Sequence, residues 1–261
     1  MIGEDAGSNV LRVGFEAAST GDGTTSTSAT AKADGSLNIG GSNGTLTLED
    51  IRLVVSGIEL EGNEEEDDGG EEDEEEENEE EENEEEEEYE TGPSALDLPL
   101  ETPEVAVAGE DDIGAGTYST FEFEVEDVES DDDDEGEEQR ELRAALDTLR
   151  EDYPEWPNKA SMVAVGTFTS ADGSSSRFKV FFNAEIEVER PLDPPLTVTA
   201  DGPSRSLTVE IDPTLWFKND DGSVDNLAES DWDDTQELVE FEAEFEDGIT
   251  EVEPGDEGEE D

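Results

Sequence analysis

The sequence has no cysteine and no histidine among its 261 residues. Without cysteine there can be no disulfide, no thiolate metal site and no cysteine nucleophile. Without histidine the chain lacks the commonest general base, the commonest metal ligand and the Ser-His-Asp arrangement. These absences remove much of the usual catalytic chemistry, and we expect the protein not to be an enzyme.

Basic residues are also scarce, because 12 Lys and Arg stand against 82 Asp and Glu, for a net charge of −70. Such a charge opposes folding, since like charges are brought together in the compact state. The Debye length is about 10 Å at 0.1 M salt and about 3 Å at 1 M, so concentrated salt removes most of the repulsion. The composition therefore predicts a halophilic protein with K⁺ or Na⁺ counterions, whose β-structure is lost when salt falls from molar to about 0.1 M.

The acidic residues fall into two groups. Residues 64–90 contain 22 acidic residues in 27 positions, and the other 234 positions still carry 60 acidic and 12 basic residues, a charge of −48. A disordered acidic chain is the alternative to a halophilic fold, but the apolar residues are patterned. Nucleic acid and anionic membranes are both disfavoured as partners, because binding to either depends on basic residues.

Long apolar runs are missing as well. No stretch of 18 apolar residues occurs, so we expect no membrane-spanning segment. The residues Met1–Asp5 lack the basic and apolar regions of a signal peptide. The protein is then either cytoplasmic or directed by a targeting segment outside the given chain, and a lipid anchor would need such an upstream segment.

What is present is strand patterning. Phe121, Phe123 and Val125 alternate with glutamates, which is the period of a sheet with one buried and one wet face. A similar alternation runs through residues 178–188 and 239–245. About ten strands are predicted, at 10–15, 45–60 (one strand, or two with a bend near Asp50), 95–100, 105–108, 117–128, 162–169, 177–189, 196–200, 206–211 and 238–245. We expect 196–200 and 206–211 to pair with each other across a turn.

One helix interrupts the strands. Apolar residues at helical spacing predict it over about residues 137–152, and prolines stop it at 154 and 157. Many short strands with turn signals between them predict a mainly β fold, an antiparallel β-sandwich with this one inserted helix.

We expect the chain to be organised around one domain. Residues 1–44 are predicted to be an N-terminal strand and a Ser/Thr/Gly-rich linker, and residues 45–250 a single β-sandwich domain. Residues 62–91 are an acidic insertion within that domain, predicted to be a disordered loop. Residues 251–261 are an acidic tail.

The strongest candidate for a metal site is a near match to a calcium-binding loop. Asp131, Asp133 and Glu135 fall at positions 1, 3 and 5 of an EF-hand-like loop, followed by Gly136. Position 12 would be Leu142, which cannot supply the bidentate carboxylate. A plain acidic loop without a cofactor is the alternative, and the tract at 64–90 offers only a loose counterion atmosphere.

Carboxylates are too numerous for their sequence positions to indicate a glycoside hydrolase. Trp156, Trp216 and Trp232 are available for a sugar platform, with packing in the core as the alternative.

Four segments resemble DUF4382, a domain of unknown function found in secreted or lipid-anchored bacterial and archaeal proteins. They are Leu48–Leu60, Leu96–Leu98, Gly114–Tyr118 and Leu207–Asp212. The resemblance covers about residues 45–250 and implies a β-sandwich on the cell surface. It brings no catalytic residues, and the acidic insertion and the helix depart from the family's usual spacing.

Three hypotheses about function follow. The first is a non-enzymatic extracytoplasmic module of a halophile that acts as a cell-surface structural or interaction protein, with a protein or cell-envelope partner. The second is a low-affinity divalent cation-binding protein, with calcium as the candidate ion. The third is a carboxylate-based glycoside hydrolase.

Overall fold

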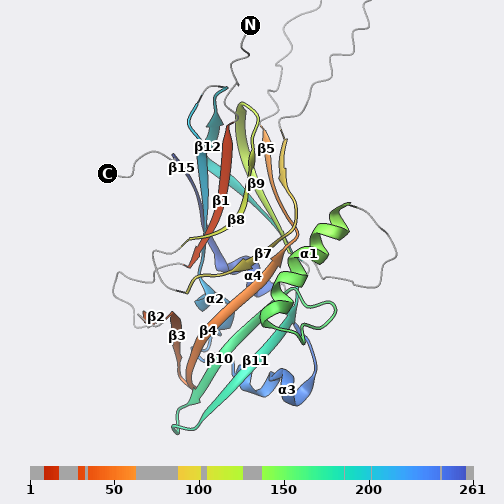
Figure 1. The fold of residues 1–261 in the computed structure, drawn as a ribbon. Coiled ribbons are helices and arrows are strands. Elements are labelled where there is room, and N and C mark those ends of the chain that lie inside the picture. The colour runs from red at the N-terminus through yellow and green to blue at the C-terminus, as the bar shows by residue number, and fades with distance from the viewer. Residues whose placement is uncertain are drawn as a thin grey trace, which may run out of the picture.

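The computed structural model describes residues 9–17, 29–32, 35–62, 88–100, 105–125, 137–184, 186–200, 202–241 and 243–256. In these residues the fold is mainly β, with fifteen strands in three sheets and helices around them (Figure 1). The predicted fold class is therefore confirmed.

We call the three sheets A, B and C. Sheet A has the order β15 (Ile249–Asp256), β13 (Arg205–Ile211), β1 (Val10–Ala17) and β8 (Ala106–Asp112). Sheet C has the order β12 (Ile186–Val198), β9 (Gly116–Val125), β5 (Gly57–Gly62) and β6 (Glu88–Thr91). Sheet B has the order β14 (Val239–Glu240), β11 (Ser175–Asn183), β10 (Met162–Ser170), β4 (Gly44–Val55), β3 (Ser36–Gly41) and β2 (Ala29–Lys32). A seventh strand, β7 (Ser94–Asp97), pairs with the C-terminal end of β4.

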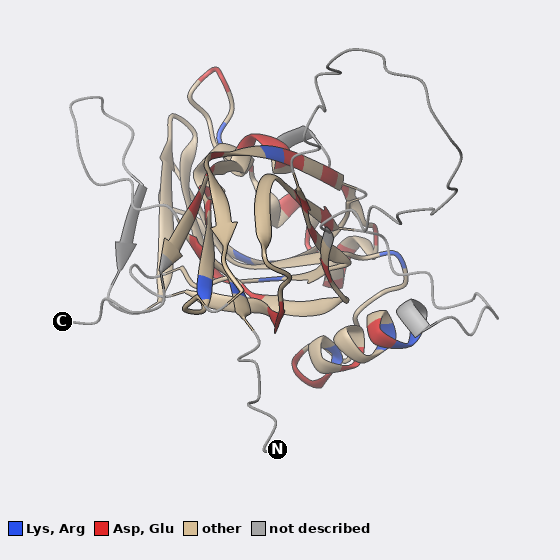
Figure 2. Ribbon diagram, turned by 90° about the horizontal axis from the view of Figure 1, so that it is seen from above, with Lys and Arg blue, Asp and Glu red and all other residues tan. Residues whose placement is uncertain are grey.

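Sheets A and C face each other as a sandwich. Phe15 on β1 meets Phe123 on β9 with ring centroids 5.1 Å apart. The predicted alternation in β9 is confirmed, because Phe121, Phe123 and Val125 are fully buried between the sheets. Viewed from above, the strands surround a common interior and the long helix lies outside it (Figure 2).

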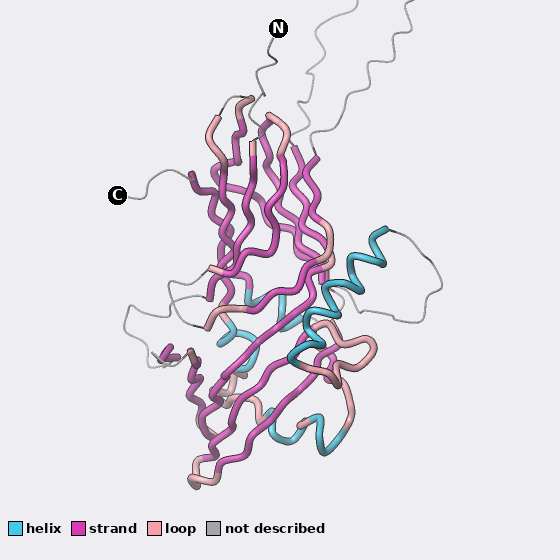
Figure 3. The backbone as a smooth tube through the Cα atoms, in the orientation of Figure 1, coloured by secondary structure: helices cyan, strands magenta, loops and turns pink. Residues whose placement is uncertain are grey.

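Sheet B extends the molecule beyond the sandwich (Figure 3). The chain passes from sheet B to sheet C through Ser56, which lies between the end of β4 and the start of β5. The predicted segment 45–60 is therefore two strands. Their break lies at Ser56, while the irregularity next to Asp50 is a register shift against β10.

The predicted helix is confirmed as α1 (Glu137–Asp152). Its buried residues follow one stripe and pack on the outer face of sheet B against Val54, Val163 and Phe181. Burial of this stripe explains why the segment is helical, since an amphipathic helix is stabilised by the surface on which it packs. The stripe consists of Leu142, Ala145, Leu146 and Leu149.

The predicted strand at 238–245 is wrong. Only Val239–Glu240 form a strand, and Ala243–Gly248 form the helix α4. Phe241 precedes α4 and Phe245 lies within it, and both pack on Trp216. The alternation of aromatic residues with glutamates therefore did not identify a strand here. Three further short helices occur in the described C-terminal third: α2 (Pro213–Phe217), the 3₁₀ helix η1 (Leu227–Ser230) and α3 (Trp232–Thr235).

The predicted hairpin between 196–200 and 206–211 is also wrong. β12 pairs with β9, and β13 lies between β15 and β1. β13 runs parallel to β1, and β14 runs parallel to β11, so the sheets are not wholly antiparallel. An alternating pattern identifies the buried face of a strand but does not identify its partner. The predicted strand 177–189 is likewise divided, at Ala184, between β11 and β12.

The folded unit begins earlier and ends later than the predicted domain. β1 lies inside sheet A, and β2 and β3 fall in the predicted linker at 17–44. β15 continues to Asp256, within the predicted acidic tail. Residues 63–87 of the predicted insertion lie outside the described part of the chain.

None of the helices in the described ranges combines the length and the hydropathy that a membrane crossing requires.

Candidate functional site

A row of glutamates crosses the outer face of sheet C. Glu189 on β12 lies opposite Glu122 on β9, Glu122 lies opposite Glu59 on β5, and Glu59 lies opposite Glu90 on β6. The row thus places one glutamate on each of the four strands. Like charges directly opposite each other in a sheet are destabilising in dilute buffer, so this row is a site where cations are attracted.

A second group of carboxylates lies beside the row. Glu187 on β12 pairs in register with Glu124 on β9, two residues from Glu122. Carboxylate oxygens from Glu122, Glu124 and Glu187 all lie within 4.8 Å of one another. Such oxygens are the ligands that Ca²⁺ accepts at 2.3–2.6 Å in coordination shells of roughly 6–8 atoms, so the three side chains are close enough to share one ion.

The electrostatics of Glu122 reflect this crowding. Partial burial, followed by the charges of Glu187, Glu61 and Glu189, raises the pKa of the Glu122 carboxyl above its ordinary value. A raised carboxyl pKa means that the folded state favours a proton at this position. A metal ion or a layer of K⁺ or Na⁺ would relieve the same repulsion.

Sheet A repeats the arrangement on its own outer face. Glu16 on β1 lies opposite Glu210 on β13, and Glu210 lies opposite Glu251 on β15. Burial, with the charges of Glu210 and Glu253, raises the pKa of Glu16. Both outer faces of the sandwich therefore carry cross-strand rows of glutamate.

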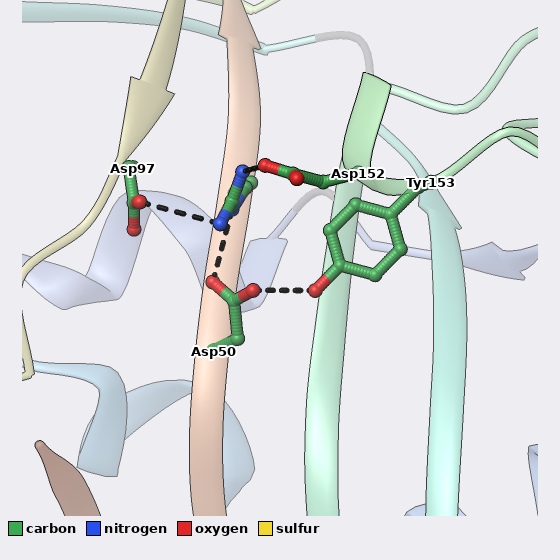
Figure 4. Close-up of polar contacts among 5 residues, drawn as sticks. Asp50, Asp97, Asp152 and Tyr153 are labelled. Carbon is green, nitrogen blue, oxygen red and sulfur yellow. Dashed lines mark hydrogen bonds and ion pairs between the residues drawn. The ribbon is translucent and has the colours of Figure 1, made fainter. Parts of the chain in front are cut away.

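Sheet B carries a polar cluster of a different kind, in which carboxylates surround a cation, Arg52 of β4 (Figure 4). Its guanidinium lies 3.2 Å from Asp50 and 3.5 Å from Asp97 on β7, and it also donates to Asp152 at the end of α1. The Tyr153 hydroxyl donates to Asp50, and the Arg52 guanidinium carbon lies 5.6 Å from the centre of the Tyr153 ring. We call these five residues the Arg52 cluster.

The Arg52 cluster ties α1 to two strands. Partial burial alone would lower the pKa of Arg52, but the hydrogen bond to Asp152 and the charges of Asp50 and Asp97 outweigh it and raise that pKa. Burial raises the pKa of Asp97 even beside the arginine, with Asp50 and Asp152 adding to the effect. Every member has a partner within the cluster, so its arrangement is that of a structural clamp.

A small hollow of about 250 Å³ lies on the outer face of sheet A. Its lining includes Arg12, Ser206 and Thr208 together with the exposed side chains of Val105 and Val107. It is smaller than ordinary ligand pockets, which span roughly 300–1,000 Å³.

Three tryptophans singled out from the sequence lie in the described part of the chain, and Trp156 packs beside Tyr153 of the Arg52 cluster with ring centroids 6.3 Å apart. Asp131, Asp133 and Glu135 lie outside the described residues. Trp156 and Trp216 are buried and donate their indole N–H groups to backbone carbonyls, so both are packing residues. Trp232 packs edge-on against Phe181.

The glutamate rows were missed because the sequence does not give the register. Glutamates alternating with apolar residues in 121–125 and 186–189 indicate a wet face, which the structure confirms. Their alignment across four strands depends on pairings that no local pattern reveals. For Arg52 a signal was available, because an arginine in a strand of an acidic chain is the natural partner for neighbouring carboxylates.

Comparison with family models found no match for this chain. Comparison with curated proteins and with solved structures found none either.

Proposed function

We propose that this protein is a non-enzymatic structural or interaction module of the cell surface in a halophile. The four-glutamate row across sheet C is the observation that carries the proposal. A sheet with like charges opposite one another on every strand suits a medium rich in cations, where a layer of K⁺ or Na⁺ screens the repulsion. The extracytoplasmic location rests on the resemblance to DUF4382.

Location is the part of this proposal that a single experiment tests. An antibody against the protein is used on fractionated source cells, and intact cells are treated with an external protease. We expect the protein in the envelope or secreted fraction and cleavage of it on intact cells, with a cytoplasmic marker left uncut. Recovery only from the cytosol would overturn the extracytoplasmic location.

The grouping of Glu122, Glu124 and Glu187 favours a second candidate function, the weak binding of a divalent cation such as Ca²⁺. The three carboxylates would supply oxygen ligands from two adjacent strands. Calorimetric titration with CaCl₂ in about 1 M KCl tests it, because that salt already screens non-specific attraction.

Variants make that titration specific. We expect heat of binding in the parent protein and its loss in Glu124→Gln/Glu187→Gln. The matched control is Asp220→Asn/Asp234→Asn, which removes the same charge from exposed positions outside the sheets. Equal titrations of the parent and both variants would end this second candidate.

A further inference from the structure

The charge of the described strands is divided very unevenly between the two halves of the molecule. The eight strands of sheets A and C contain 17 acidic and 3 basic residues, a net charge of −14. The seven strands of sheet B contain 4 acidic and 4 basic residues, a net charge of zero. Among the strands, the repulsion that salt screens is therefore concentrated in the sandwich.

The spacing of the glutamates within a row determines the salt concentrations at which their repulsion is felt. Neighbouring strands lie about 4.8 Å apart, so a row across four strands spans about 14 Å. At 0.1 M salt the Debye length is about 10 Å, so each glutamate is repelled by the glutamates of its row that lie up to two strands away. At 1 M the length of about 3 Å is shorter than a single spacing between strands, and most of the repulsion disappears.

Sheet B has stabilising partners of its own. One face carries a separate apolar cluster in which α1 packs on Val54, Val163 and Phe181. The other face belongs to the core that sheet B shares with the sandwich, and there Phe217 and Phe241 contact Phe182 of β11. Its outer face also holds ion pairs, those of Arg52 and those of Lys179 with Glu155 and Asp233.

We propose that the two parts of the fold respond differently to salt: when the salt concentration falls, sheets A and C unfold while sheet B and α1 remain folded. The glutamate rows Glu189–Glu122–Glu59–Glu90 and Glu16–Glu210–Glu251 drive the opening. One boundary between the two parts lies at Ser56, between β4 and β5, and another lies at Ala184, between β11 and β12. This inference concerns folding and stands whether or not the proposed function is correct.

Hydrogen exchange read by mass spectrometry tests the order of opening in the full chain. Amide protection is measured at steps between about 3 M and about 0.1 M KCl. We expect peptides from β9, β12 and β13 to lose protection by about tenfold or more at a salt concentration where β10, β11 and α1 keep theirs. Loss of protection in all these elements at the same step, or first in β10, would overturn the proposal.

A matched pair of variants separates the rows from total charge. Glu59→Gln/Glu122→Gln/Glu189→Gln removes three charges from the row on sheet C. Asp220→Asn/Asp234→Asn/Glu237→Gln removes three charges from exposed positions outside the sheets. Only the first variant should keep β9 and β12 protected at several-fold lower salt than the parent. An equal shift in both variants would show that net charge, rather than the rows, controls the opening.

Discussion

Arg52 shows how much a single cation can organise in a chain with so few of them. It has 20% of its side chain exposed and contacts carboxylates from β4, β7 and the end of α1. Isolated ion pairs on a surface contribute little, but a partly buried cation with several carboxylate partners is different. Its removal would leave three negative charges close together with nothing to offset them.

We therefore expect Arg52→Gln to lower the free energy of unfolding by about 2 kcal/mol. Unfolding by urea at a fixed high salt concentration measures the change. The control is Arg177→Gln on the same sheet, because Arg177 is exposed and has no ion pair with the described residues. Equal stabilities of the two variants would show that the Arg52 cluster does not clamp the helix.

At the scale of elements, the join between α4 and β15 depends on one glycine. Gly248 ends α4, and a Cβ atom placed there would overlap the indole ring of Trp216. Trp216 cannot move aside easily, because it is buried, stacks on Phe245 and donates to the Phe245 carbonyl.

We expect Gly248→Ala to destabilise the protein by about 1–3 kcal/mol through overpacking. Thermal unfolding followed by tryptophan fluorescence measures it. Gly57→Ala is the control, because the nearest atom to its added Cβ is a Glu124 carboxylate oxygen at an ordinary 3.4 Å. If Gly248→Ala unfolded at the same temperature as Gly57→Ala, the indole ring would not be fixed in place.

Elements with one unambiguous period could be predicted from the sequence. The stripe from Leu142 to Leu149 fits only a helix, and the alternation of Phe121, Phe123 and Val125 with glutamates fits only a strand. The alternation that ends at Phe245 misled, because Phe245 lies in α4 and packs on Trp216. The start of α2 does have a local sequence signal, because Asp212 caps the helix and Pro213 is its first residue.

Partners between elements could not be predicted in the same way. The pairing of β13 with β1 joins segments almost two hundred residues apart, and it depends on the shape of the whole core. The glutamate rows depend on such pairings, so the candidate site could be recognised only from the structure. The calcium-loop residues Asp131, Asp133 and Glu135 stay a prediction.

For the whole molecule, crowded carboxylates make stability depend on pH. The pKa values of Glu16, Glu122 and Asp97 are raised in the folded state, chiefly by burial and then by nearby charges. Between the unfolded and folded pKa values the folded state binds more protons, so the free energy of unfolding falls as pH rises. The lowered pKa values of Glu155 and Asp172 act the other way, at pH below about 4.

We therefore expect the protein to be more stable near pH 5 than near pH 7 when salt is moderate. Urea unfolding at the two pH values measures the difference, and Glu122→Gln should reduce it. Asp220→Asn, an exposed substitution, should leave it unchanged. A free energy of unfolding that rises from pH 5 to pH 7 would contradict this account.

The neutral sheet B and the acidic sheets A and C occupy opposite ends of the described molecule (Figure 1). Considering those strands alone, the centre of negative charge is displaced toward the sandwich, which gives the framework of strands an electric asymmetry. Beside a negatively charged wall these strands contribute a torque that turns sheet B toward the wall and the sandwich away from it. The same strands that make the fold sensitive to salt thus also set a preferred orientation at an interface.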